Sequence, residues 1–126
     1  MDINKDNFKQ ITENMRKVLV YMASRKDPFG WEYISHMADE IGLDNEYTKS
    51  LVHDLLDAGL LKAKDINSVT PSLSHKGLEL AQDLSNDERF KHAVELCEKQ
   101  EVYSLSAVAM TVRQLASKSI IEEINR

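Results

Sequence analysis

The chain has 126 residues, a net charge of −5, 42% hydrophobic residues and 29% charged residues, a composition typical of a globular protein of one domain's size. Its single cysteine, Cys97, excludes an intrachain disulfide and a cysteine-based zinc site. The polar start of the sequence and the lack of an apolar run of about 20 residues predict a cytoplasmic protein with no secretory signal and no membrane span.

Three amphipathic helices are predicted in the first half of the chain. Apolar residues recur at three- and four-residue steps over 8–22, and shorter patterns of the same kind follow over 33–41 and 45–58. Gly42 and Gly59 stand where a left-handed residue ends a helix, and Asp44 or Asn45 can cap the third helix. The connection over 42–44 has the length of the turn in a helix-turn-helix.

A short β-hairpin is predicted after the third helix. Residues 60–64 and 69–73 can form two strands joined by a polar loop. Pro71 has no amide hydrogen and therefore restricts the second strand to an edge position or a bulge.

Helical patterns return after the hairpin, over 74–84, around Phe90 to Cys97, and from Leu105 to Ile120 or Ile124. Ser85 and Asn86 separate the first two of these helices. The order predicts a mainly α fold: a winged helix-turn-helix domain over 1–84, with three helices and a two-stranded wing, and a helical extension over 85–126 that packs or dimerises.

Two stretches carry a family resemblance. Residues 51–61, from Leu51 to Leu61, look like the end of a winged-helix recognition helix that runs into its first wing strand. Residues 73–83 resemble the segment that closes the wing in a family of short uncharacterised proteins found mainly in phages and prophages. The acidic turn, charged helix and serine-opened last helix of that family have counterparts at 86–93 and 104–108, although Phe90 stands where the family often has tryptophan. The resemblance spans about 47–117 and implies a winged helix in a phage or prophage setting, without a biochemical activity.

The polar side of the third predicted helix is the candidate DNA-binding site, because the first turns of a recognition helix face the bases in a major groove. The lysines of the predicted wing either contact phosphates or only protect the edge of the sheet from further strand pairing. The expected DNA-contacting residues are Asn45, Glu46, Thr48, Lys49, His53, Lys62, Lys64 and Lys76.

The charge of this helix leaves two functions open. Residues 44–58 hold one lysine against four acidic residues, a net charge of −3, whereas a helix that faces phosphates usually avoids negative charge. The chain is either a DNA-binding transcription regulator or an acidic protein-protein interaction module that inhibits or adapts a host or phage protein.

The last helix carries a wide apolar stripe, which predicts either packing on the rest of the chain or a homodimer. A dimer would suit a helix-turn-helix protein, since paired half-sites match two-fold symmetry. The stripe consists of Leu105, Val108, Ala109, Val112, Leu115, Ala116 and Ile120.

Enzymatic, metal-dependent and cofactor-dependent functions find no support in the sequence. The four glycines are too widely spaced for a phosphate-binding loop, and the four histidines form no zinc-binding pair. Cys97 and the aromatic group Phe29, Trp31 and Tyr33 are predicted to lie in the core. We therefore expect a binding protein without cofactor or metal.

Overall fold

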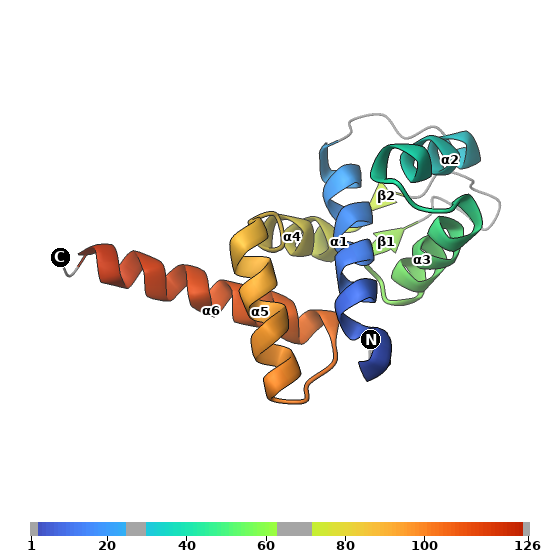
Figure 1. Cartoon of the computed structure of the whole chain (residues 1–126). Coiled ribbons are helices and arrows are strands. Elements are labelled where there is room, and N and C mark those ends of the chain that lie inside the picture. The colour runs from blue at the N-terminus through green and yellow to red at the C-terminus, as the bar shows by residue number, and fades with distance from the viewer. Residues whose placement is uncertain (1–2, 25–29, 63–71, 125–126) are drawn as a thin grey trace. The chain divides into compact units, whose positions relative to one another are not determined.

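The computed structural model describes residues 3–24, 30–62 and 72–124, and the described chain is mainly helical with one two-stranded antiparallel sheet (Figure 1). The chain forms two compact units. Asn14–Gln82 make up one, here the central unit, and Met1–Glu13 together with Asp83–Arg126 make up the other, here the terminal unit. The grouping of Met1–Glu13 with the last part of the chain was not predicted from the sequence.

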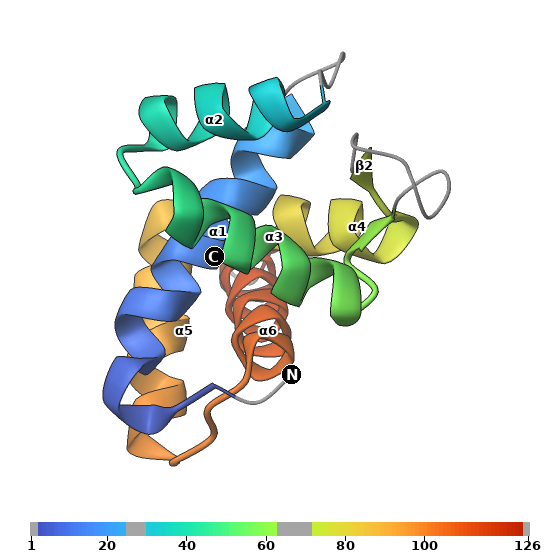
Figure 2. The ribbon, with the colours of Figure 1, turned by 90° about the vertical axis from the view of Figure 1, so that its right-hand side faces the viewer.

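The central unit holds the predicted helices and strand pair. Helix α1 (Phe8–Ser24) begins in the terminal unit and continues into the central one, where α2 (Gly30–Ile41) and α3 (Asn45–Asp57) follow. Strands β1 (Leu61–Lys62) and β2 (Ser72–Leu73) pair antiparallel with Leu61 opposite Leu73, and α4 (His75–Asp83) comes next. Helix α2 packs against α3 (Figure 2), and α3 contacts β1. The predicted pairing is confirmed, while residues 63–71, with Pro71, lie outside the described residues.

Two glycines end helices as the sequence predicts. Gly42 and Gly59 have φ angles of 75° and 76°. After each, an amide reaches back to the last turn: Leu43 donates to the Ala38 carbonyl at 2.9 Å and Leu60 to the Leu55 carbonyl at 3.0 Å. These are the bonds of a Schellman motif, which satisfies carbonyl groups at a helix end.

Gly77 in α4 lies against the chain that leads into β1. A Cβ atom at this position would collide with the carbonyl oxygen of Leu60 and lie 2.9 Å from its carbonyl carbon. Ser74 holds the same junction: its amide donates to the Leu60 carbonyl at 3.1 Å, and its hydroxyl donates to the Gly59 carbonyl at 2.7 Å. The close approach of α4 to this backbone therefore requires a residue without a side chain.

The terminal unit joins the first residues to the last two helices, α5 (Asp87–Lys99) and α6 (Leu105–Ile124), which pack against each other. The Ile3 amide donates to the Tyr103 carbonyl at 2.8 Å. The rings of Phe8 and Tyr103 meet edge to face with centroids 5.3 Å apart. A short 3-10 helix, η1 (Lys5–Asn7), lies between these two contacts in the sequence. Hydrogen bonding and ring contact together attach the start of the chain to the α5–α6 connection.

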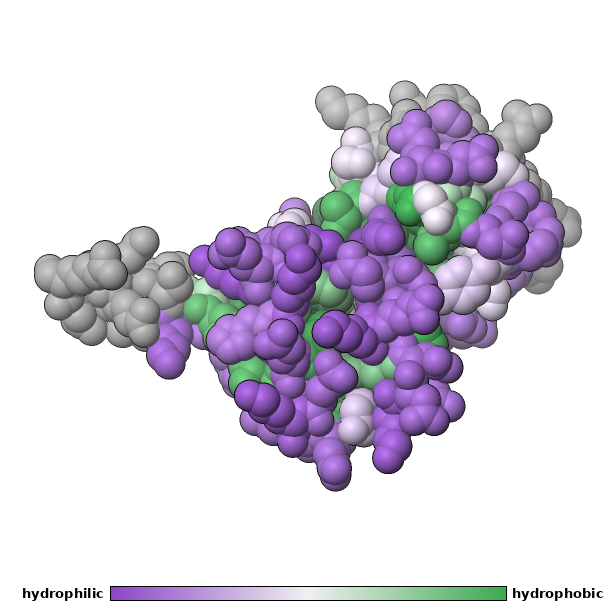
Figure 3. Space-filling model, viewed as in Figure 1, coloured by the Kyte–Doolittle hydropathy of each residue, from purple (hydrophilic) through white to green (hydrophobic). Residues whose placement is uncertain are grey.

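The hydrophobic core contains Cys97, as predicted. The outward face of α5 visible in Figure 3 is hydrophilic, in keeping with the exposed charged residues along that helix.

The side chains of Phe29, Trp31 and Tyr33 lie outside the described residues. No helix within the described ranges is long and apolar enough to cross a membrane.

Glu101 ends α5 in a conformation that favours glycine. Its φ angle is 57°, and the next amide, that of Val102, donates to the Cys97 carbonyl at 3.0 Å. The position is therefore equivalent to Gly42 and Gly59, but it carries a side chain that makes the left-handed backbone costly.

Replacement of Glu101 by glycine is expected to raise the free energy of unfolding by about 1 kcal/mol, because glycine adopts this conformation without the steric cost of a Cβ atom. Urea unfolding followed by circular dichroism measures the change. Glu101→Ala is the matched control, since it removes the same charge and keeps the Cβ. An equal gain in both variants would show that charge, rather than backbone conformation, is responsible.

Candidate functional site

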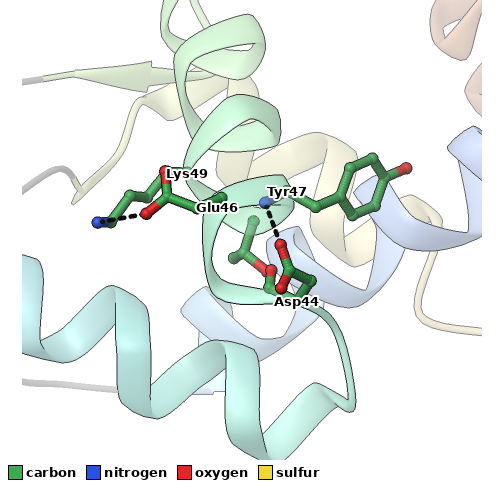
Figure 4. Close-up of polar contacts among 5 residues, drawn as sticks. Asp44, Glu46, Tyr47 and Lys49 are labelled. Atoms are coloured by element: carbon green, nitrogen blue, oxygen red, sulfur yellow. Dashed lines mark hydrogen bonds and ion pairs between the residues drawn. The ribbon is translucent and has the colours of Figure 1, made fainter.

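Helix α3 carries most of the predicted DNA-contacting residues, and its first turn is fixed by Asp44. One carboxylate oxygen of Asp44 accepts a hydrogen bond from the Tyr47 amide at 3.1 Å (Figure 4). This bond satisfies one of the amide groups that lack a partner within the helix. The start of α3 is thus defined, and so are the positions of the following residues around the helix axis.

One side of α3 is buried, and it includes Thr48 with Leu51, Val52 and Leu55. The Thr48 hydroxyl donates to the Asp44 carbonyl at 2.8 Å. This bond within the helix lets a polar side chain be buried with its donor satisfied. The prediction that Thr48 is an exposed DNA-contacting residue is therefore wrong, because its side chain is fully buried.

Tyr47 fixes the rotation of α3 about its axis. The side-chain amide of the buried Asn14, on α1, donates to the Tyr47 hydroxyl at 3.0 Å. Figure 4 shows the Tyr47 ring on the opposite side of the helix from Glu46 and Lys49. The contact with α1 therefore directs Glu46 and Lys49 away from the core of the central unit.

The outer face of α3 lies opposite its buried side. At about 100° per residue, Glu46, Ser50, His53 and Asp57 fall close to one line along the helix, with Lys49 beside them. The first four are exposed and Lys49 is half-buried. Glu46, Lys49 and His53 were predicted from the sequence as exposed site residues, whereas Ser50 was not. The four-residue step from Glu46 to Ser50 could have indicated that Ser50 lies on the outer face.

The remaining predicted DNA-contacting residues are distributed over the central unit. Asn45 is half-buried, and its side-chain oxygen is buried without a hydrogen-bond partner among the described residues. Lys62 on β1 and Lys76 on α4 are both exposed, and β1 contacts α3. Lys64 lies outside the described residues. Lys62 is thus the predicted DNA-contacting lysine whose strand contacts the candidate helix.

The charge of the outer face changes along α3. At the N-terminal end, a carboxylate oxygen of Glu46 lies 3.4 Å from the ammonium nitrogen of Lys49, so that the two charges offset each other. Toward the C-terminal end, Asp54 and Asp57 are exposed. The charges of the outer face are therefore balanced at its N-terminal end, the end that a recognition helix turns toward the bases. Further along the helix the face is acidic.

The apolar stripe of α6 is largely covered within a single chain. Leu105, Val108, Ala109 and Val112 are buried, and α5 packs against α6. Leu115 and Ala116 are half-buried, and the side chain of Ile120 lies outside the described residues. A dimer formed through this stripe is not supported, because the four buried side chains are not available to a second copy.

No protein-family model, curated protein or solved structure matches the chain. Within the ranges that the structure describes, no group of three or more histidine, cysteine, aspartate or glutamate side chains is arranged to hold a metal ion. A function is therefore inferred from the geometry and charge of α3.

Proposed function

We propose that the chain is a winged helix-turn-helix protein that binds double-stranded DNA through the outer face of α3, as a transcription regulator of phage or prophage type. One observation carries the proposal: α2 and α3 are joined over Gly42, Leu43 and Asp44, and the antiparallel pair β1–β2 follows α3 directly. A recognition helix with this connection inserts its N-terminal end into the major groove.

The position of the exposed lysines supports the same function. The N-terminal part of α3 presents short or charged polar side chains, which suit contact with base edges. Lys62, on the strand next to α3, supplies a cation for the phosphate backbone beside the groove. The outer face of α3 would then read the bases while the wing holds the backbone.

Removal of one phosphate contact should lower the salt dependence of binding. We expect the full chain to bind a labelled random duplex at low salt, and Lys62→Ala to reduce the slope of log affinity against log salt by about 1. Fluorescence anisotropy at several salt concentrations measures this slope.

The matched control for this titration is Lys118→Ala, which removes an exposed lysine from α6 in the terminal unit and should leave the slope unchanged. Equal changes in both variants would indicate a general charge effect. An unbound duplex at micromolar protein and low salt would overturn the DNA-binding proposal.

A second function is favoured by the acidic residues. Asp39 and Glu40 on α2 are exposed, as are Asp54 and Asp57 on α3. A surface of this charge attracts a basic protein and repels phosphate. If the duplex titration shows no binding, the same helices would act as an interaction module for a protein partner with a basic surface.

A further inference from the structure

The first turn of α3 presents a hydrogen-bond acceptor and a donor as one unit. The Glu46 carboxylate and the Lys49 ammonium lie 3.4 Å apart on the same side of the helix (Figure 4). The Glu46 side chain is 81% exposed and that of Lys49 is 34% exposed. An exposed pair at this spacing contributes only about 0.3–0.5 kcal/mol to helix stability, so stability alone gives little reason for the arrangement.

The major-groove edge of a C·G base pair has the complementary arrangement. Cytosine offers its N4 amino group as a donor, and guanine offers O6 and N7 as acceptors. Cytosine N4 and guanine O6 are joined by a Watson–Crick hydrogen bond and therefore lie about 3 Å apart. That separation is close to the distance between the two charged groups of α3.

We propose that Glu46 and Lys49 read one C·G base pair together, with the Glu46 carboxylate accepting from cytosine N4 and the Lys49 ammonium donating to guanine O6 and N7. The inference rests on the proposed DNA-binding function and names the base pair that this site selects. The pairing follows the known preferences of carboxylates for cytosine and of lysine for guanine.

An A·T pair fits the same two side chains less well. Adenine N6 is a donor for a carboxylate, but the acceptor N7 lies beside it and would repel the negative charge. On the thymine side, the methyl group stands next to the O4 acceptor that Lys49 would need. In a C·G pair, both acceptors belong to guanine, on the lysine side, and cytosine itself offers the carboxylate only its N4 donor.

The negative charge of Glu46 gives the inference a sharp test. A carboxylate near the phosphates weakens binding to every duplex, whereas a carboxylate that reads cytosine also determines the sequence preference. Glu46→Gln removes the charge and leaves an amide, which pairs with adenine rather than cytosine. Affinity for random duplex should therefore rise while preference at one position changes from cytosine to adenine.

The experiment is selection from a random duplex library with the full chain, followed by affinity measurement on the selected site and on single-base variants of it. The wild-type chain should prefer C·G at one position by at least about fivefold, and Glu46→Gln should lose that preference. Asp57→Asn is the matched control, because it removes one exposed acidic charge from the same face of α3, about three turns further along. It should raise affinity and leave the selected sequence unchanged. Circular dichroism confirms that each variant is folded.

The outcomes separate this inference from the proposed function. Selection of a motif that is the same for the wild-type chain and Glu46→Gln would overturn the reading of C·G and leave DNA binding intact. A motif that changes equally in Asp57→Asn would also overturn it, since a general charge effect would then be responsible. Failure of the wild-type chain to bind any duplex at low salt would overturn the proposed function itself.

Discussion

Replacement of Gly77 by alanine is expected to lower the free energy of unfolding of the central unit by about 3 kcal/mol. The added Cβ would overlap the Leu60 carbonyl oxygen, and this neighbour is backbone that cannot turn aside as a flexible side chain does. Overpacking at such a contact costs about 1–3 kcal/mol and occasionally more. The same carbonyl accepts the Ser74 amide, so a shift that relieves the overlap would also weaken the junction between β2 and α4.

The expected loss of stability is opposite in sign to the usual effect of replacing glycine by alanine in a helix. Within a helix, alanine is ordinarily favoured over glycine by up to about 1 kcal/mol. Lys76→Ala, at the neighbouring exposed position of α4, is the matched control and should change stability by less than about 0.5 kcal/mol. Urea unfolding followed by circular dichroism measures both variants. A Gly77→Ala chain as stable as the control would show that α4 does not approach the Leu60 backbone this closely.

Replacement of Val108 by aspartate is expected to cost about 4 kcal/mol at neutral pH. Val108 is 0% exposed, and a buried carboxyl without a partner must hold its proton. The ordinary pKa of aspartate is about 3.9, and each pH unit above it costs about 1.36 kcal/mol for a group kept protonated. Burial raises the pKa of the introduced carboxyl in the folded chain, so the loss of stability grows as pH rises above about 4 and shrinks as pH falls toward it.

Met110→Asp is the control for this prediction. Met110 lies two residues away on α6 and is 61% exposed, so the same new charge should alter stability by less than about 0.5 kcal/mol. Urea titrations at pH 7 and pH 4.5 test both variants, and sedimentation reports their mass. A Val108→Asp chain that stays folded but changes from dimer to monomer would instead place Val108 between two copies.

Local sequence patterns were sufficient to predict the order of the helices. Asp44, one of the two predicted caps of α3, and Asn86, at the predicted break before α5, each accept a hydrogen bond from the amide three residues on. These signals work because a cap is decided by neighbours in the sequence. The attachment of Ile3 and Phe8 to Tyr103 was missed, because a contact between positions about 100 residues apart leaves no periodic signal.

The candidate site was predicted less well than the helix that carries it. Tyr47 lies within the apolar pattern over 45–58, yet the residue is 36% exposed and its hydroxyl accepts a hydrogen bond from Asn14. Thr48 was placed outside because threonine is polar, yet its hydroxyl bonds to the helix backbone and its methyl group is buried. Side chains with both polar and apolar parts shift the apparent phase of an amphipathic helix, and the structure was needed to correct it.

The division of the chain into a continuous unit and a unit made from both ends has a consequence for its synthesis. The central unit is made of one continuous stretch, residues 14–82, so this unit can fold while translation continues. Ile3 and Phe8 are made before the central unit but must wait for Tyr103. These early residues are thus placed later than the central unit that follows them, and until then the apolar side of the nascent segment is open to chaperones and to other chains.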